Sequence, residues 1–200
     1  MSTSVADTTE QLRAVLDELA PVAGAVTPAQ LSAPTPCSGW DVEQLRNHVV
    51  GWLTVFAAGF ADPHGQAPRA DIEGFAVSDD AAGEVRGAAD TLDRALRHGA
   101  AERPLRLGEQ GMPGELALGM VLWEYVVHGW DLARATGQAW SPPTAAVEAS
   151  LAFAPGMLTE EYQGEGEGKP FAPRVPVAAD APPLDRLLGL SGRDPNWQPG

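Results

Sequence analysis

The segment LWEYVVHGWDLARATG, residues 122–137, places three ionisable residues in a stretch that otherwise reads as a buried amphipathic helix. Glu124, His128 and Asp131 are separated by four and then three residues, so they share one face of a helix. The rest of that stripe is small or apolar, which predicts that it faces the core. A buried carboxylate or imidazole is costly unless it is paired or bound to a metal. The three residues therefore either satisfy one another or bind something else.

A second histidine completes a set of metal-ligand types. His48, in NHVVGWLTVF, lies beside the apolar face of a second predicted helix. With Glu124 and His128 it would supply three neutral or anionic ligands suited to zinc or a similar divalent ion. Three protein ligands leave one coordination position open, as in catalytic sites. The competing interpretation is that Glu124 and His128 form an ordinary surface pair at i, i+4.

Asp131 has more than one role open to it. It could orient His128 from one turn away, or act as an acid or base on a thiol or substrate. Alternatively, it is a surface carboxylate paired with Arg134, three residues further along the same helix. Trp52, one turn beyond His48, is expected near any substrate. Cys37 is interpreted as a small buried hydrophobe rather than a catalytic thiol.

Composition and charge restrict the partners. The 200 residues are 44% hydrophobic, enough for one sizeable core and a single domain over 1–200. The formal net charge of −14 repels phosphate backbones and anionic lipid, so neither nucleic acid nor membrane is expected as a partner. One cysteine and no basic, apolar leader predict a cytoplasmic protein without an intramolecular disulfide. A homodimer is left open.

Helical periodicity runs through most of the chain. It predicts four main helices, around Leu12–Leu19, from Asp41 to Phe60, from a Ser78 cap to His98, and from Glu115 to Thr136 with Gly137 as the stop. The segment RPLRLGEQGMPG predicts a short extended excursion, and a fifth helix follows SPPT, limited by Pro155.

The last part of the chain changes character. From about residue 164 to 200 it is rich in glycine and proline, with one short helical run at PPLDRLLGL and aromatic anchors at Phe171 and Trp197. We interpret it as an irregular strap packed over the helices. The expected fold is therefore all-α, an up-and-down four-helix bundle with an irregular C-terminal strap.

Three segments carry a family resemblance. TPCSGWDVEQLRNHVVGW, WEYVVHGWDLARATGQ and the ending GRDPNW together resemble the DinB-like metal-binding superfamily, in the actinobacterial branch related to the N-terminal domain of mycothiol-dependent maleylpyruvate isomerase. The similarity covers nearly the whole chain. It implies a four-helix bundle in which a histidine of the second helix and a Glu-x-x-x-His pair hold a divalent metal, commonly zinc. On this sequence those positions are His48, Glu124 and His128.

The resemblance also implies a co-substrate, because several relatives use the low-molecular-weight thiols mycothiol or bacillithiol. A metal would keep such a thiol deprotonated near neutral pH as a nucleophile for transfer or conjugate addition to a small-molecule substrate. The expected function is thus a zinc-dependent, mycothiol-dependent thiol transferase or isomerase. Two alternatives stay open: a thiol-independent metalloenzyme (a lyase, hydrolase or cyclase), and a non-enzymatic protein that binds a metal or small ligand.

One departure from the isomerases bears on the substrate. They carry an additional C-terminal domain that contributes to the active site, and the segment after Gly164 is too short for one. Maleylpyruvate is therefore not the substrate expected here. An anion-binding arginine would have to come from the bundle or the strap, where the candidates are Arg46, Arg86, Arg174 and Arg193.

Overall fold

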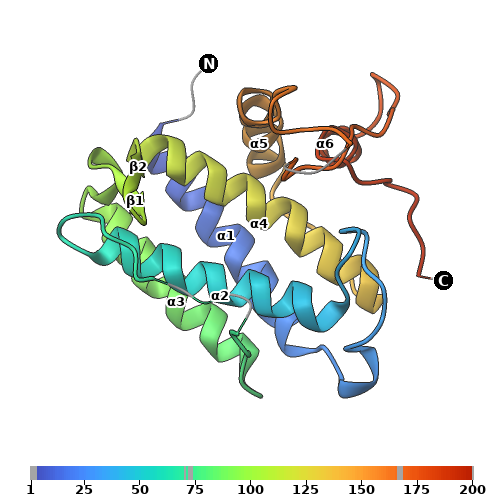
Figure 1. Cartoon of the computed structure of the whole chain (residues 1–200), viewed down its shortest axis with the longest axis horizontal. Coiled ribbons are helices and arrows are strands. Elements are labelled where there is room, and N and C mark those ends of the chain that lie inside the picture. The colour runs from blue at the N-terminus through green and yellow to red at the C-terminus, as the bar shows by residue number, and fades with distance from the viewer. Residues whose placement is uncertain (1–3, 70, 72–73, 166–168, 200) are drawn as a thin grey trace.

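Four long helices form the body of the molecule (Figure 1). The computed structural model describes residues 4–69, 71, 74–165 and 169–199. The four helices are α1 (Val5–Gly24), α2 (Val42–Ala61), α3 (Ala81–Arg97) and α4 (Gly114–Thr136). Short 3₁₀ turns at Pro28–Gln30 and Ala100–Glu102 precede α2 and follow α3. None of the helices in these ranges has the length and apolar character needed to cross a bilayer.

Side-chain caps determine where the helices begin and end. Capping boxes at Ser4 and Asp41 start α1 and α2. Asp80 caps α3 by accepting a bond from a backbone N–H of its first turn. The predicted Ser78 cap was wrong by two residues, because the Ser78 hydroxyl instead accepts from the Asp80 N–H ahead of the helix. Gly137 ends α4 with φ +70°, as predicted.

The four helices form two pairs, and the two helices of each pair run parallel. The Gln138 side chain donates to the Val22 carbonyl and joins the ends of α1 and α4, which run parallel. The Val77 N–H donates to Asn47 Oδ1 and joins the beginnings of α2 and α3, which also run parallel. The connection between α2 and α3 therefore returns along the bundle, and the helices do not alternate strictly up and down. The expected all-α bundle with a C-terminal strap is confirmed, and the structure adds these directions.

Apolar stripes of all four helices meet in one core. It includes Leu16 of α1, Leu53 of α2, Leu92 of α3 and Leu122 of α4, each no more than 2% exposed. The predicted extended excursion is an antiparallel hairpin of β1 (Leu105–Leu107) and β2 (Gln110–Met112). Helix α5 (Thr144–Met157) packs on α4, with Pro155 in its last turn, and α6 (Pro183–Leu190) packs on α5.

The strap is held against α4 by specific contacts. Trp123 donates from Nε1 to the Ser191 hydroxyl at 3.0 Å, and Arg134 donates from Nε to the Trp197 carbonyl at 2.7 Å. The predicted anchors Phe171 and Trp197 both pack against the core. Residues 169–199 of the strap therefore form a wall beside α4 that contacts this helix at Trp123 and at Arg134.

Candidate functional site

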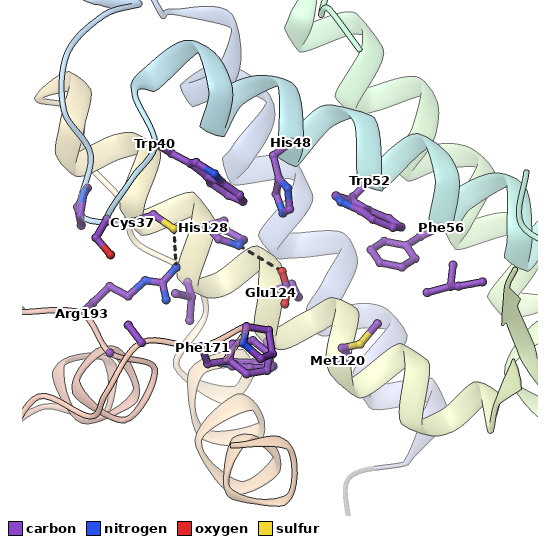
Figure 2. Close-up of a pocket in the computed structure, with 18 residues that line it drawn as sticks. Cys37, Trp40, His48, Trp52, Phe56, Met120, Glu124, His128, Phe171 and Arg193 are labelled. Carbon is purple, nitrogen blue, oxygen red and sulfur yellow. Dashed lines mark hydrogen bonds and ion pairs between the residues drawn. The ribbon is translucent and has the colours of Figure 1, made fainter. Parts of the chain in front are cut away.

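Helices α2 and α4 bring His48, Glu124 and His128 together (Figure 2). One potential ligand atom of each residue lies within 4.8 Å of the others. His128 Nε2 is 3.2 Å from Glu124 Oε2, and the centroids of the two imidazole rings are 5.2 Å apart. A buried hydrogen bond of 3.1 Å from the Tyr125 hydroxyl to the Val49 carbonyl, one residue beyond Glu124 and His48, fixes the two helices in this register.

The ionisable groups of this cluster shift one another's pKa values. Burial and the neighbouring His128 lower the pKa of His48 to about 4, which keeps this imidazole neutral. Burial also disfavours a charged His128, but hydrogen bonds to Asp131 and Glu124 outweigh it and raise its pKa to about 9. Burial opposes ionisation of Glu124, yet its bond to His128 brings the pKa below its usual value. The carboxylates thus supply negative charge that a proton or a metal ion can balance.

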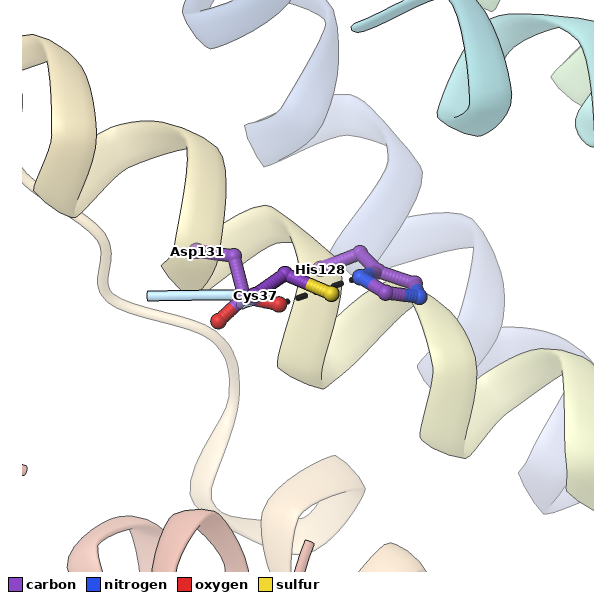
Figure 3. A group of neighbouring side chains, drawn as sticks. All are labelled: Cys37, His128 and Asp131. Atoms are coloured by element: carbon purple, nitrogen blue, oxygen red, sulfur yellow. Dashed lines mark hydrogen bonds and ion pairs between the residues drawn. The ribbon is translucent and has the colours of Figure 1, made fainter. Parts of the chain in front are cut away.

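Asp131 lies next to His128 (Figure 3). It contacts Nδ1 of the imidazole, whereas Glu124 contacts Nε2. Its side chain has no exposed surface, and Oδ2 is 3.0 Å from His128 Nδ1. If a metal replaced the Nε2 proton, His128 would still donate from Nδ1 to this carboxylate and would present its Nε2 lone pair toward Glu124 and His48. The alternative pairing with Arg134 is wrong, because that guanidinium bonds to the strap. The geometry favours the orienting role for Asp131, since a fully buried carboxylate cannot touch a substrate.

Arg193 of the strap is the charge partner of Asp131. Its Nη2 lies 3.0 Å from Asp131 Oδ2, and Nε lies 3.3 Å from both carboxylate oxygens. Nη1 donates to the Ser191 carbonyl at 2.7 Å, and Nη2 also donates to Cys37 Sγ at 3.3 Å. Every guanidinium nitrogen is therefore bonded to the protein itself.

The four arginines proposed for anion binding differ in whether they line the cavity. Arg193 alone lines the cavity in the part of the chain that the structure describes. Arg46 donates to the Ser78 carbonyl, Arg174 donates to Gln163 and the Leu158 carbonyl, and Arg86 is exposed on α3. Three of the candidates therefore lie outside the site.

Cys37 reaches the site from the loop before α2. Its Sγ, together with His128 and Asp131, forms a second group of potential ligand atoms within 4.8 Å of one another (Figure 3). Burial raises the pKa of the Cys37 thiol to about 11, although Arg193 acts in the opposite direction. The expected packing role was too narrow, because Cys37 is half-buried and lines the cavity.

A cavity of about 570 Å³ opens beside these polar groups (Figure 2). The ring of Trp40 lies 4.3 Å from that of His48, centroid to centroid. Trp52, expected near any substrate, lines the cavity and stacks on Phe56 at 5.4 Å. The strap supplies the facing wall through residues 170–172 and 192–193. The cavity is large enough for a small organic molecule.

Comparison with known proteins places this arrangement in a family. The model for the mycothiol maleylpyruvate isomerase N-terminal domain matches residues 12–133, which include His48, Glu124, His128 and Asp131. The chain belongs to this family. The uncharacterized proteins Rv0738 and MT0763, from two strains of Mycobacterium tuberculosis, are each 35% identical over 178 residues, covering 88% of this chain and 92% of theirs.

Solved structures of the family share the fold. A crystal structure of the mycothiol-dependent maleylpyruvate isomerase superposes with a TM-score of 0.61 at 15% identity, covering 80% of this chain and 71% of that one. A histidine-to-alanine mutant of that isomerase gives a TM-score of 0.58 at 17% identity, covering 83% and 75%. At this level of identity the similarity shows a shared architecture.

The sequence analysis did not place Cys37 or Trp40 at the site, and it gave Arg193 only as one of four candidate arginines. Helical periodicity does not predict that Cys37 or Arg193 contacts Asp131. Both lie on irregular segments that are distant from Asp131 in the sequence. Trp40 precedes α2 by two residues, and helical periodicity does not predict its contact with His48. The available signal was that TPCSGW and GRDPNW, which carry these three residues, also carry the family resemblance.

Proposed function

We propose that this protein is a divalent-metal-dependent enzyme, with zinc as the metal, that uses a low-molecular-weight thiol such as mycothiol in a transfer or isomerisation reaction. The observation that carries the proposal is the convergence of His48, Glu124 and His128 at the wall of a cavity. Membership of a family described by a mycothiol-dependent isomerase domain supports the choice of thiol and of reaction class.

The donor set suits such a metal. Two imidazoles and one carboxylate are ligand types found in catalytic zinc sites, which keep a position open. When bound, the metal would lower the pKa of an incoming thiol and keep it as a thiolate near neutral pH. His48, Glu124 and His128 would hold the ion, each from a helix whose position is fixed by the apolar core.

The surrounding residues have supporting tasks. Asp131 would keep a proton on Nδ1 of His128 while a metal replaces the proton on Nε2, and we assign it as a positioning residue. Arg193 holds Asp131 in turn. Trp40 packs against His48, and the neighbouring rings exclude water from the reacting groups, which strengthens electrostatic interactions there.

Cobalt substitution tests whether the thiol binds to the metal. The Co²⁺-loaded protein is titrated with mycothiol while the near-ultraviolet sulfur-to-cobalt charge-transfer absorption is followed. We expect a saturable band at about one thiol per chain. S-methyl mycothiol, which has no ionisable thiol, should give none. Absence of the band with mycothiol would contradict the thiol-dependent function and favour a thiol-independent metalloenzyme.

A further inference from the structure

The walls of the cavity are aromatic on opposite sides. Helix α2 supplies Trp52 and Phe56, while Trp123 of α4 packs against Phe171 of the strap at 5.3 Å between ring centroids. Trp40 adds a further ring from the loop before α2. Rings in this arrangement offer flat apolar surfaces, against which a planar ligand can stack.

Among the residues that the structure describes, every cationic side chain that lines the cavity already bonds to the protein. Among the lining residues that the structure describes, Arg193 is the only arginine or lysine. Its guanidinium is already bonded to Asp131, to the Ser191 carbonyl and to Cys37. Recognition of a carboxylate typically uses a guanidinium fork presented to the ligand, whereas the nitrogens of this one already bond to the protein.

The formal charges of the loaded site also cancel. Arg193 offsets Asp131, and a divalent ion would be offset by Glu124 together with a thiolate. A carboxylate substrate would then sit unpaired among aromatic rings, which is unfavourable. The net charge of −14 on the whole chain further opposes the approach of anions.

We infer that the substrate of this cavity is an uncharged, flat and largely apolar molecule, and not a carboxylate. The inference rests on the proposed function for the reaction at the metal, but its basis is the shape and charge of the walls. It names a substrate class different in charge from maleylpyruvate, which carries two carboxylates, and it concerns binding, which can be measured without turnover.

Matched ester and acid probes test the inference by titration calorimetry. Methyl 2-naphthoate is compared with 2-naphthoate, and dimethyl phthalate with phthalate, on metal-free protein and on zinc-loaded protein saturated with mycothiol, whose thiolate would occupy the open coordination position. We expect each ester to bind at least about tenfold more tightly than its acid in both forms. An acid that binds as tightly as its ester, in either form, would overturn the inference. The cobalt titration tests the proposed function separately, so the two can fail independently.

Added charge provides the converse test. Met120 lines the cavity one turn before Glu124, so Met120→Arg is combined with Glu124→Gln, which removes the carboxylate that would otherwise pair with the new guanidinium. We expect phthalate to bind at least about tenfold more tightly to this double variant than to Glu124→Gln alone. Leu116→Arg adds the same charge one turn earlier, at a side chain that is 40% exposed outside the cavity, and in the same background should leave phthalate affinity unchanged. Equal phthalate affinity in the folded double variant and in Glu124→Gln would contradict the inference.

A ring deletion keeps the test independent of the folding of Met120→Arg. Trp52→Leu removes one aromatic wall while retaining an apolar side chain. We expect methyl 2-naphthoate to bind roughly three- to tenfold more weakly, as is typical for loss of one aromatic contact. Unchanged affinity for this ester would show that the rings do not select the ligand, and would overturn the inference.

Discussion

Asp131 lies between His128 of the candidate metal centre and Arg193 of the C-terminal strap. Its Oδ2 atom is 3.0 Å from His128 Nδ1 and 3.0 Å from Arg193 Nη2. The carboxylate is fully buried, and both of its partners are nearly so. This pair of contacts connects the orientation of a proposed ligand on α4 to a residue near the end of the chain.

Loss of the Arg193 contact should weaken metal binding without removing a ligand. We predict that Arg193→Gln lowers zinc affinity by about tenfold, the lower end of effects seen when a residue supporting a metal ligand is replaced. Competition with a chromophoric chelator measures the change. Arg174→Gln is the matched control, because Arg174 also belongs to the strap but bonds to Gln163 and Leu158 outside the site. An equal loss in both variants would indicate a general effect of the strap.

The buried ion pair should also matter for stability. Asp131→Asn leaves the Arg193 guanidinium buried without its counter-charge, and we predict a loss of about 3–5 kcal/mol in the free energy of unfolding. Urea denaturation of the metal-free protein measures it. Asp93→Asn breaks the pair with the exposed Arg97 on α3 and should cost under about 1 kcal/mol. Similar small losses in both variants would contradict the structural importance of the buried pair.

The helical part of the site could be predicted from sequence, and the irregular part could not. The spacing of Glu124, His128 and Asp131 alone places them on one face of α4, and the apolar stripe of α2 places His48 toward the same core. Arg193 reaches Asp131 only through the path of the strap, which has no periodicity to read. The direction of α3 likewise depends on a long connection whose course the sequence does not specify.

His128 belongs to both groups of potential metal ligands, and removal of Cys37 distinguishes between them. Cys37→Ala should leave zinc stoichiometry unchanged, because the Arg193 cation lies against Cys37 and Asp131 and opposes a second cation there. Metal analysis of the purified variant measures this. Loss of zinc on removing Cys37 would assign the metal to the Cys37, His128 and Asp131 group.

Replacement of the proposed ligand Glu124 should weaken zinc binding but leave the protein folded. Glu124→Gln replaces an anionic oxygen with a neutral amide, a poorer ligand, so we predict at least about tenfold weaker zinc binding. The bundle should stay folded in this variant and after treatment with a chelator, because its core is built by apolar stripes. Chelator competition and circular dichroism measure the two properties. Unchanged zinc affinity would mean that Glu124 has a structural role.

The most direct test of the central claim is metal content by elemental analysis, on protein purified without a metal-affinity tag. We predict about one divalent ion per chain in the parent protein and in His98→Ala, a control at an exposed histidine. His48→Ala and His128→Ala should lose most of the metal while remaining folded. Stoichiometric metal retained in both site variants, or no metal bound by the parent protein even on titration, would contradict the account.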